Sequence, residues 1–487
     1  MQIQTLDLII FLAFTIATVL FGSSFIRKNK NVSDYTEAGR SLPGFIVGMS
    51  IFATYVSSIS FLALPGSAYM GNWNSFVFSL SIPVASILAA RYFVPFYRNI
   101  QSISAYSFLE ERFGYWARAY AAICYLLTQV ARTGSVLYLL ALPLHSILGW
   151  DIPVIIIMTS ICVAFYSVLG GIKAVIWTDA IQGIILVIGA LTCVVVLLCS
   201  IPGGISGFIE VGSEYNKFSL GSFGPEIDTS TFWVVLIYGT FMNLQNYGID
   251  QNYVQRYKTA KDDKSARFSA LFGGLLYVPV SLLFFIIGTA LFVYYKSQPD
   301  AIVDTLKPDQ VFPYFIVNGL PVGVTGLLIA AIFAAGMSTI STSVNSASTV
   351  ILTDFIKRKN KNLSEKSSMK VLYGTSLLLG ILGMCVGLAM MSAQNALDTW
   401  WGLTGIFSGG MLGLFLLGYL SRKVKRGAAL VGAVCGVSLI GWMTLSGQTL
   451  FHHYMTTVFG TLTIFCVGLL VSFAVGAGKQ QKENPRT

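Results

Sequence analysis

Side-chain hydroxyls gather at two places inside long apolar stretches, where isolated polar groups are costly. Ser57, Ser58 and Ser60 follow one another closely within the stretch 43–69, and five hydroxyl side chains occupy positions 338–343. Every third or fourth residue shares a helix face, so several of the second group point the same way. Hydroxyl and carbonyl oxygens are suitable ligands for a hard cation such as sodium. Hydroxyls bonded back to their own helix carbonyls are the alternative; the pairing of the two clusters favours a cation site.

Arg132 lies near the middle of the apolar stretch 118–148, far from either end. A charged side chain at membrane depth is costly and usually faces a cavity or a partner. Snorkelling to the membrane surface is the alternative, but the position is too central for it. The planar guanidinium binds carboxylates through two parallel hydrogen bonds. Arg132 therefore points to an anionic substrate.

Two further polar features each allow two interpretations. Asp179 either caps the start of a helix or supplies the negative charge of a cation site. The polar residues that close the stretch 231–254 form either a gating network at the cytoplasmic face or a solvated helix end; they are Asp250, Gln251, Gln255 and Arg256. The residues themselves leave both pairs of alternatives open.

The elements that must position these side chains are membrane-spanning helices. The chain has 487 residues, of which 55% are hydrophobic and 11% charged, whereas soluble chains carry about 25% charged residues. Apolar stretches of about 20 residues, long enough to cross a bilayer, recur along the whole length. We predict an all-α integral membrane protein, a single transmembrane domain over 1–487, with about thirteen helices. These are 6–25, 43–69, 76–97, 118–148, 152–169, 175–199, 231–254, 269–295, 322–351, 371–391, 400–420, 428–445 and 454–475.

The second of these stretches is unusual in its polar centre. Ser, Thr and Gly gather there, and Pro65-Gly66 follows. Irregular backbone at membrane depth is tolerated only where it lines a cavity or packs on protein. Interrupted helices of this kind form the substrate and ion sites of inverted-repeat transporters. Close packing by small residues is the alternative; it explains Gly48 or Ala53 well but explains the run of serines less well.

Basic residues gather in every second loop. They follow the first, third, fifth, seventh, ninth and eleventh stretches and recur in the C-terminal tail. Because Lys and Arg mark cytoplasmic loops, this alternation predicts an outside N-terminus and a cytoplasmic C-terminus in the cell membrane. It also accounts for the net charge of +10. No basic face on a soluble domain exists for a nucleic acid to bind.

The chain resembles the sodium/solute symporter family over essentially its whole length. The resemblance is carried by SDYTEAGRSLPG, FATYVSSISF, LPGSAY, SAYSFLEERFG, GGIKAVIWTDAIQG, DQNYVQRY and AAIFAAGMSTISTS, which occur in the family's order. It implies a LeuT-type fold with two inverted repeats of five helices. On that scheme 6–25 is an extra N-terminal helix, 43–200 and 231–420 are the two repeats, and 428–475 forms the C-terminal helices.

The resemblance also implies where sodium binds. The site common to the family would use the carbonyls and hydroxyls of Ala53, Val56, Ala335, Ser338 and Thr339. A second site, present in some members, would use Asp179, Ser338, Ser341 and Thr342. The resemblance thus favours Asp179 as a sodium ligand and suggests two sodium ions per transport cycle.

Within the family the chain is most similar to the bacterial sodium/sialic acid symporters. It shares with them Ser57, a hydroxyl at Ser60 (usually Thr) and Arg132, which in that group holds the carboxylate of the sugar acid. Three positions depart from the group's pattern of Phe, Gln and Phe, namely Ser75, Ser79 and Gly239. The residue that would bind the carboxylate is therefore retained, whereas the residues that would contact the glycerol and N-acyl arms of the sugar acid are not. We expect sodium-coupled import of an anionic sugar acid by alternating access, with sialic acid (N-acetylneuraminate) as the first choice.

Other functions remain as alternatives. Another carboxylate, a neutral sugar or an amino acid such as proline are possible cargoes, although Arg132 argues against a neutral sugar. An enzyme is not expected, because the three histidines, His145, His452 and His453, fall in or beside outer loops and no HExxH or GxSxG motif occurs. A membrane sensor usually carries a signalling domain, for which the tail after Val475 is too short, and a channel is the last alternative. The expected partners are the substrate, sodium and the lipid bilayer, with the chain as a monomer.

Overall fold

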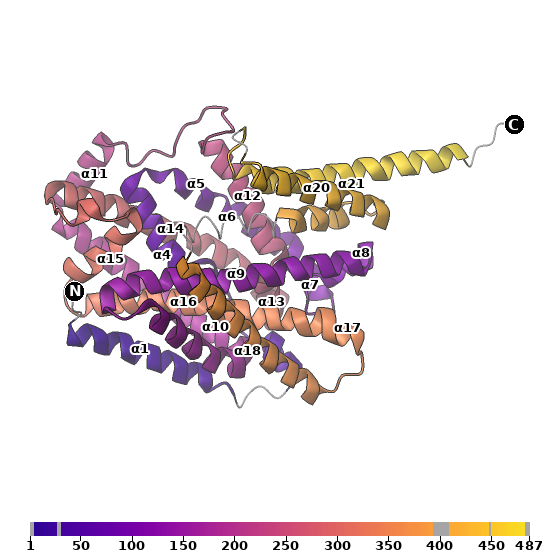
Figure 1. Ribbon diagram of the computed structural model, residues 1–487, viewed down its shortest axis with the longest axis horizontal. Helices are drawn as coiled ribbons and strands as arrows, with labels where there is room; N and C mark the ends of the chain where they lie inside the picture. The colour runs from indigo at the N-terminus through magenta and orange to yellow at the C-terminus, as the bar shows by residue number, and fades with distance from the viewer. Residues whose placement is uncertain (1–3, 27–30, 393–408, 448–449, 483–487) are drawn as a thin grey trace.

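The computed structural model describes residues 4–26, 31–392, 409–447 and 450–482 (Figure 1). Within this part, nine helical segments are long and apolar enough to cross a membrane, or up to ten if one bent pair counts as a span. Six of them are single helices: α1 (Thr5–Ser23), α9 (Tyr115–Leu148), α10 (Ile152–Ser200), α14 (Asp263–Ser297), α18 (Glu365–Ala389) and α20 (Arg426–Leu445). The seventh, Met455–Ala474, is the first part of α21 (Met455–Lys482). The eighth, Val324–Lys359, joins α16 (Val324–Val350), η6 (Ile351–Ile356) and α17 (Lys357–Lys359). The ninth, Trp73–Asn99, joins η3 (Trp73–Ser75), α5 (Phe76–Leu80), α6 (Ile82–Leu88), η4 (Ala89–Phe93) and α7 (Val94–Asn99).

The remaining predicted spans are present in another form. Two of them are merged in α10, which is interrupted at Gly171, where φ is 59° and ψ is −167°. The stretch 231–254 is divided into α12 (Phe232–Ile249) and α13 (Gln251–Thr259). Of the stretch 400–420, only the helix Gly409–Leu420 falls within the described residues. Of the basic residues that helped to orient the chain, Arg27, Lys28 and Lys30 after the first stretch and Arg486 in the tail also lie outside them.

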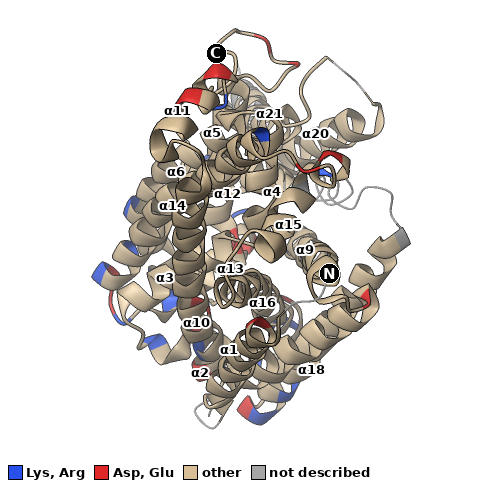
Figure 2. Cartoon of the chain, turned by 90° about the vertical axis from the view of Figure 1, so that its left-hand side faces the viewer, with Lys and Arg blue, Asp and Glu red and all other residues tan. Residues whose placement is uncertain are grey.

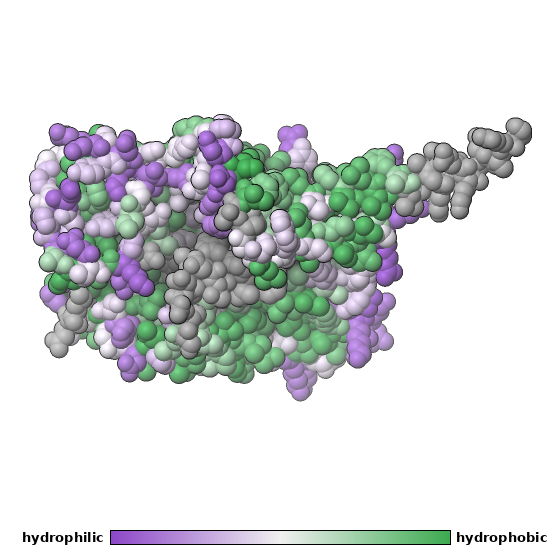
Figure 3. All heavy atoms as spheres, turned by 45° about the horizontal axis from the view of Figure 1, so that its top comes forward, coloured by the Kyte–Doolittle hydropathy of each residue, from purple (hydrophilic) through white to green (hydrophobic). Residues whose placement is uncertain are grey.

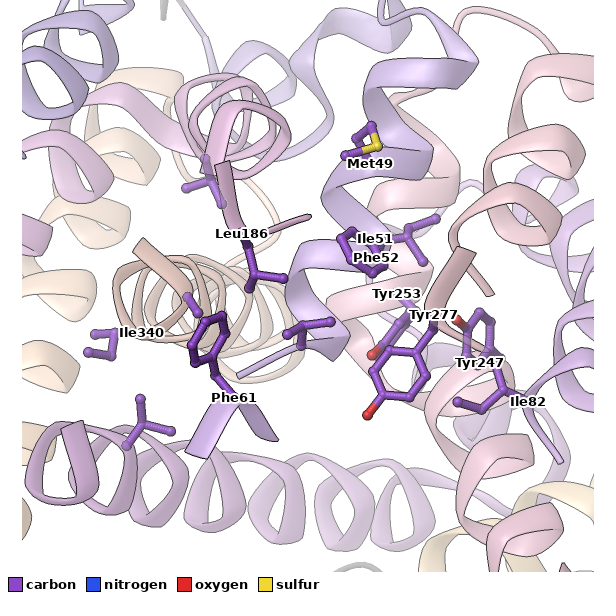
Figure 4. Packing of buried hydrophobic residues seen from close by; sticks show 14 of the residues in the cluster. Met49, Ile51, Phe52, Phe61, Ile82, Leu186, Tyr247, Tyr253, Tyr277 and Ile340 are labelled. Atoms are coloured by element: carbon purple, nitrogen blue, oxygen red, sulfur yellow. The ribbon is translucent and has the colours of Figure 1, made fainter. Parts of the chain in front are cut away.

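The bent pair is the stretch that the sequence marked as broken. Its halves are α3 (Gly44–Tyr55) and α4 (Ser58–Met70), which bend by 54°. Val56 and Ser57 between them are extended, with ψ of 109° and 167°. The Ser57 hydroxyl accepts a hydrogen bond from the backbone N–H of Ser60 and so caps α4. Figure 4 shows Phe52 on one side of this break and Phe61 on the other.

The break therefore lies at the serine cluster, and α4 continues through Pro65. α14 packs closely against this part of α4. A Cβ added at Gly288 of α14 would lie 2.1 Å from the Pro65 carbonyl oxygen, so glycine is required for the approach.

The hydroxyl-rich helix α16 lies at the centre of the bundle. It contacts α1, α3, α4, α9 and α10, and all of its residues except Val324 and Leu327 are buried inside the protein. Its polar cluster therefore faces other helices and not lipid. The lipid-facing surface is supplied by the outer helices, and Figure 3 shows hydrophobic residues between more hydrophilic ends.

Short helices outside the spans were not predicted. α11 (Gly204–Glu214) and α15 (Pro308–Asn318) lie at the end of the molecule that carries the N-terminus, whereas α8 (Ser107–Phe113) lies at the opposite end, where the span Val324–Lys359 ends in α17 (Figure 1). Each is too short for a periodic apolar pattern to distinguish it from a loop. Viewed from the end that carries the N-terminus, most of the ribbon carries residues other than Lys, Arg, Asp and Glu (Figure 2).

Candidate functional site

A cavity of about 540 Å³ lies among α4, α5, α9, α12 and α14. This volume is in the range of small-molecule binding sites. Five of the six residues predicted to contact a substrate line it, namely Ser57, Ser60, Ser75, Ser79 and Arg132. Because these residues come from three separate segments of the chain, the fold brings them to one place.

Gly239 is the sixth predicted residue, and it does not belong to the described lining. It is buried in α12 and packs against α5. A Cβ at this position would lie 2.6 Å from Ser81 Oγ and 3.2 Å from Phe78 Cα. Glycine at 239 thus permits close helix packing, and its neighbour Tyr238 is the residue that reaches the cavity.

Arg132 brings a positive charge to the cavity wall. It is half-buried, and its Nη2 donates a hydrogen bond to the Thr54 carbonyl, 3.2 Å away in the last turn of α3. Asp250 also lines the cavity and caps α13, accepting a hydrogen bond of 2.7 Å from the Asn252 backbone N–H. These two are the only Lys, Arg, Asp or Glu side chains in the described part of the lining.

The hydroxyls of the lining are partly engaged with one another. Ser79 Oγ lies 2.7 Å from Ser281 Oγ, and Ser75 Oγ lies 3.3 Å from Ser67 Oγ. Their hydrogen-bonding capacity is not exhausted, because a hydroxyl is one donor and two acceptors.

Sequence reasoning missed the aromatic and amide part of the lining. Tyr253 and Tyr277 come together beside the α3–α4 break (Figure 4). Tyr454, just before α21, stacks on Tyr238 with ring centroids 4.3 Å apart and planes inclined by 5°. The missed members of the lining include Tyr55, Tyr125, Gln129, Tyr238, Gln245, Asn246, Tyr253, Tyr277 and Tyr454. Along the sequence, tyrosines in apolar stretches resemble ordinary packing residues, and only helix packing reveals which of them converge.

The residues predicted for the common sodium site come from the end of α3 and from α16, two helices that contact each other. The last turn of α3 leaves carbonyls without helical partners, because Val56 is already extended. Ser338 Oγ is buried without a hydrogen-bond partner, and Thr339 Oγ1 donates to the Ala335 carbonyl at 3.1 Å. A buried hydroxyl without a hydrogen-bond partner is the kind of group that a hard cation can use as a ligand.

The alternative for the α16 hydroxyls is realised in some of them. Ser341 Oγ donates to the Ser338 carbonyl at 3.0 Å, as Thr339 does to Ala335. Ser338 and Ser343 do not follow this pattern, since both hydroxyls are buried and unpartnered. Bonding back to the helix thus accounts for part of the cluster and leaves Ser338 to be explained.

Asp179 is the centre of the predicted second sodium site. It is fully buried and accepts hydrogen bonds from Ser50 Oγ at 2.7 Å and from Arg256 Nη2 at 2.8 Å, both on Oδ2. Its Oδ1 has no hydrogen-bond partner. Arg256 also donates to Thr342 Oγ1 at 2.6 Å, so two of the predicted ligands lie around one guanidinium.

Two of the alternatives left open by the sequence are wrong. Asp179 does not cap a helix, because it lies more than two turns past the interruption at Gly171. Gln251, Gln255 and Arg256 do not form a solvated helix end, because all three are fully buried. Among the residues that the structure describes, no three His, Cys, Asp or Glu side chains gather to hold a metal ion.

Comparison with known proteins identifies the family to which the chain is similar. The model of the sodium:solute symporter family matches residues 35–436. The chain is 32% identical to the sodium/sialic acid symporter NanT of Aliivibrio fischeri, with 96% of this chain and 93% of NanT covered. It is also 32% identical to the sodium/sialic acid symporter SiaT of Proteus mirabilis, with 95% and 94% covered.

A solved structure extends the similarity to three dimensions. It is the substrate-bound outward-open state of a Na⁺-coupled sialic acid symporter, with a TM-score of 0.91 and 30% identity, and the match covers 96% of this chain and 98% of that one. The predicted LeuT-type helical fold is confirmed by this match, and the matching family is one of transporters, as the lack of catalytic motifs led us to expect. The chain is a member of the sodium:solute symporter family.

Proposed function

We propose that the chain imports an anionic sugar acid together with sodium, and that sialic acid (N-acetylneuraminate) is the substrate. The observation that carries the proposal is Arg132, the one basic side chain in the described lining of the cavity. A half-buried guanidinium with donors to spare binds a carboxylate through charge-assisted hydrogen bonds. The tyrosine and amide side chains around it suit a polyhydroxylated body. The two sodium/sialic acid symporters to which the chain is similar support the same substrate.

In this proposal, two sodium ions bind before the substrate. One takes the carbonyls of Ala53, Val56 and Ala335 with the hydroxyls of Ser338 and Thr339, and so holds α3 against α16. The other takes Asp179 with Ser338, Ser341 and Thr342. The unpartnered Ser338 Oγ and Asp179 Oδ1 support these assignments. Sodium then favours the state whose cavity binds the substrate, which is the requirement for coupling.

The architecture behind alternating access is part of the proposal. The repeats would run over 43–200 and 231–420, each opening with an interrupted helix: α3–α4 in the first and α12–α13 in the second. The helix 6–25 and the helices of 428–475 would flank them. The protein would act as a monomer, with its N-terminus outside and its C-terminus in the cytoplasm.

Uptake of labelled N-acetylneuraminate by proteoliposomes tests the function. An inward sodium gradient should drive accumulation above the external concentration, and potassium in place of sodium should abolish it. Uptake that is the same with and without a sodium gradient would contradict the proposal. Competition by small monocarboxylates, neutral sugars and proline, each in excess, tests the substrate class; strong competition by proline or a neutral sugar would contradict the role of Arg132.

A further inference from the structure

The short helix α13 stands between the substrate cavity and Asp179. Its residues are buried throughout. Asn252 and Arg256 are four positions apart, so they share one face of the helix. Both are fully buried and carry several hydrogen bonds.

Asn252 is joined to the wall of the cavity. Tyr125, Gln129 and Arg132 lie on one face of α9, and all three line the cavity. The Tyr125 hydroxyl donates to Asn252 Oδ1 at 3.0 Å. Asn252 Nδ2 donates to Gln129 Oε1 at 3.3 Å. The amide of Asn252 therefore holds the α9 face that presents Arg132.

The other end of the connection reaches the predicted sodium ligands. Arg256 Nη1 donates to the Asn252 carbonyl at 2.8 Å. Its Nη2 lies 2.8 Å from Asp179 Oδ2, and neither side chain is exposed. Hydrogen bonds thus run without interruption from Tyr125 and Gln129, through Asn252 and Arg256, to Asp179.

We propose that Asn252 is a positioning residue that couples substrate binding to sodium occupancy at Asp179; this inference rests on the proposed function. A cation beside Asp179 competes with Arg256 for the same carboxylate, because one negative charge cannot fully compensate two positive ones. Arg256 therefore has two arrangements, paired with Asp179 or released from it. The bond from Arg256 to the Asn252 carbonyl carries this change to Asn252, whose amide shifts Tyr125 and Gln129 beside Arg132. This is a two-state element on which both sites act, as coupling requires.

The test compares substrate affinity without sodium and with saturating sodium, measured by calorimetry on the purified full chain with N-acetylneuraminate. The ratio of the two dissociation constants is the coupling factor, for which the wild type should give about tenfold or more. Asn252→Ala removes the amide but keeps the backbone carbonyl that Arg256 uses, so the factor should fall close to one. Stabilisation of this variant against heat by sodium alone should persist, because Asp179 is intact.

Two further variants distinguish a loss of coupling from a general loss of packing of α13. Gln251→Ala deletes another fully buried amide of α13, one that bonds to the backbone of Ile103 and Ala105 and to neither site; its coupling factor should stay that of the wild type. Tyr125→Phe keeps the ring and removes only the hydroxyl, so it should lower the factor and add little to Asn252→Ala in a double variant. If Asn252→Ala does not fold, Tyr125→Phe alone tests the same connection.

The outcomes distinguish the two proposals. A wild-type coupling factor of one overturns the proposed function, and the coupling role with it. A normal wild-type factor that Asn252→Ala and Tyr125→Phe both retain overturns the role of Asn252 alone. An equal fall of the coupling factor in Gln251→Ala and Asn252→Ala also overturns the role of Asn252, because it would reflect a general loss of packing of α13.

Discussion

At the scale of single residues, Arg132 is the clearest case of a side chain whose position determines its chemistry. Its charge would be costly in lipid, but the structure places it at a cavity wall, with a hydrogen bond to the end of α3. Asp250 supplies an opposite charge in the same cavity. Arg132 is thus stabilised by its surroundings and still available to an incoming carboxylate.

Arg132→Ala should weaken binding of N-acetylneuraminate by about 2–5 kcal/mol, or at least about thirtyfold, because the carboxylate loses its partner. Sodium binding should be unaffected, since the predicted sodium ligands are other residues. Calorimetry measures the first effect, and stabilisation by sodium alone measures the second. Arg91→Ala, which removes an exposed arginine outside the cavity lining, is the control. A carboxyl-reduced sugar that competes as well as the acid would contradict this role.

Asp179 and Arg256 form a buried ion pair. Substitution of either residue should therefore affect both the stability of the protein and the proposed sodium binding. Neither side chain is exposed, and each would be an uncompensated buried charge without the other. Breaking such a pair is costly, whereas removing both charges together can be nearly neutral. The two effects can therefore be separated by single and double substitution.

Asp179→Asn should destabilise the protein by about 3–5 kcal/mol, because Arg256 remains buried and charged. It should also lower the proposed stoichiometry from two sodium ions per substrate to one. Asp179→Asn combined with Arg256→Gln should recover most of the stability but not the second ion. Thermal unfolding reports the stability, and reversal potentials in proteoliposomes report the stoichiometry. An unchanged stoichiometry in both variants would exclude Asp179 as a ligand.

At the scale of elements, α4, the second half of the broken helix, is held at its end by a lysine from a distant loop. Lys217 lies just beyond α11, and its Nζ donates to the Tyr69 carbonyl at 2.6 Å and the Gly71 carbonyl at 3.0 Å. The same Nζ lies 3.8 Å from the centre of the Phe292 ring. A cation at a helix C-terminus compensates the partial negative charge of the free carbonyls. Lys217 thus connects the end of α4 to the loop after α11 and to α14.

Burial lowers the pKa of Lys217 from 10.5 to about 8. Between these values the unfolded chain binds more protons than the folded chain, so the Lys217 contribution to the free energy of unfolding increases with pH. Lys217→Met should remove that part of the pH dependence. Thermal midpoints of wild type and variant, compared across this window, check the effect. Lys296→Met, which removes an exposed lysine in the same region, is the control, and parallel pH curves for wild type and Lys217→Met would refute the expectation.

At the scale of the whole molecule, the distribution of charge bears on the proposed orientation in the membrane. α8 and α17 lie at the end of the molecule opposite the N-terminus (Figure 1), and their ends are joined by ion pairs. Glu110 accepts from Arg118 at 2.8 Å and from Arg358 at 2.9 Å, and Arg118 also pairs with Asp354 at 2.6 Å. Two of the loops that the sequence marked as basic, those after the third and ninth predicted spans, thus meet on one face, which supports the proposed cytoplasmic side.

Protease-cleavable tags at the two termini test this orientation. In right-side-out membrane vesicles, external protease should remove the N-terminal tag and leave the C-terminal tag intact, with the reverse result in inverted vesicles. Cleavage of both tags from the same side would mean an even number of spans and contradict the count of about thirteen.

The amino-acid sequence by itself determined the membrane class, the helical spans, the broken second span and the family. These follow from local properties: apolar length, clustered serines, basic loops and long ordered motifs. The break between α3 and α4 was evident because Ser57 and its neighbours are polar within an otherwise apolar stretch. Five of the six predicted substrate residues also line one cavity.

Only the tertiary structure decided how distant residues meet. It joined Arg256 to Asp179 and so excluded a solvated helix end, placed Gly239 against Phe78 rather than in the cavity, and brought Tyr454 onto Tyr238. None of these contacts has a local signature, because each depends on how helices far apart in sequence pack together. A charged residue within an apolar stretch indicates in the sequence that a partner is needed. Which residue becomes that partner depends on how the helices pack.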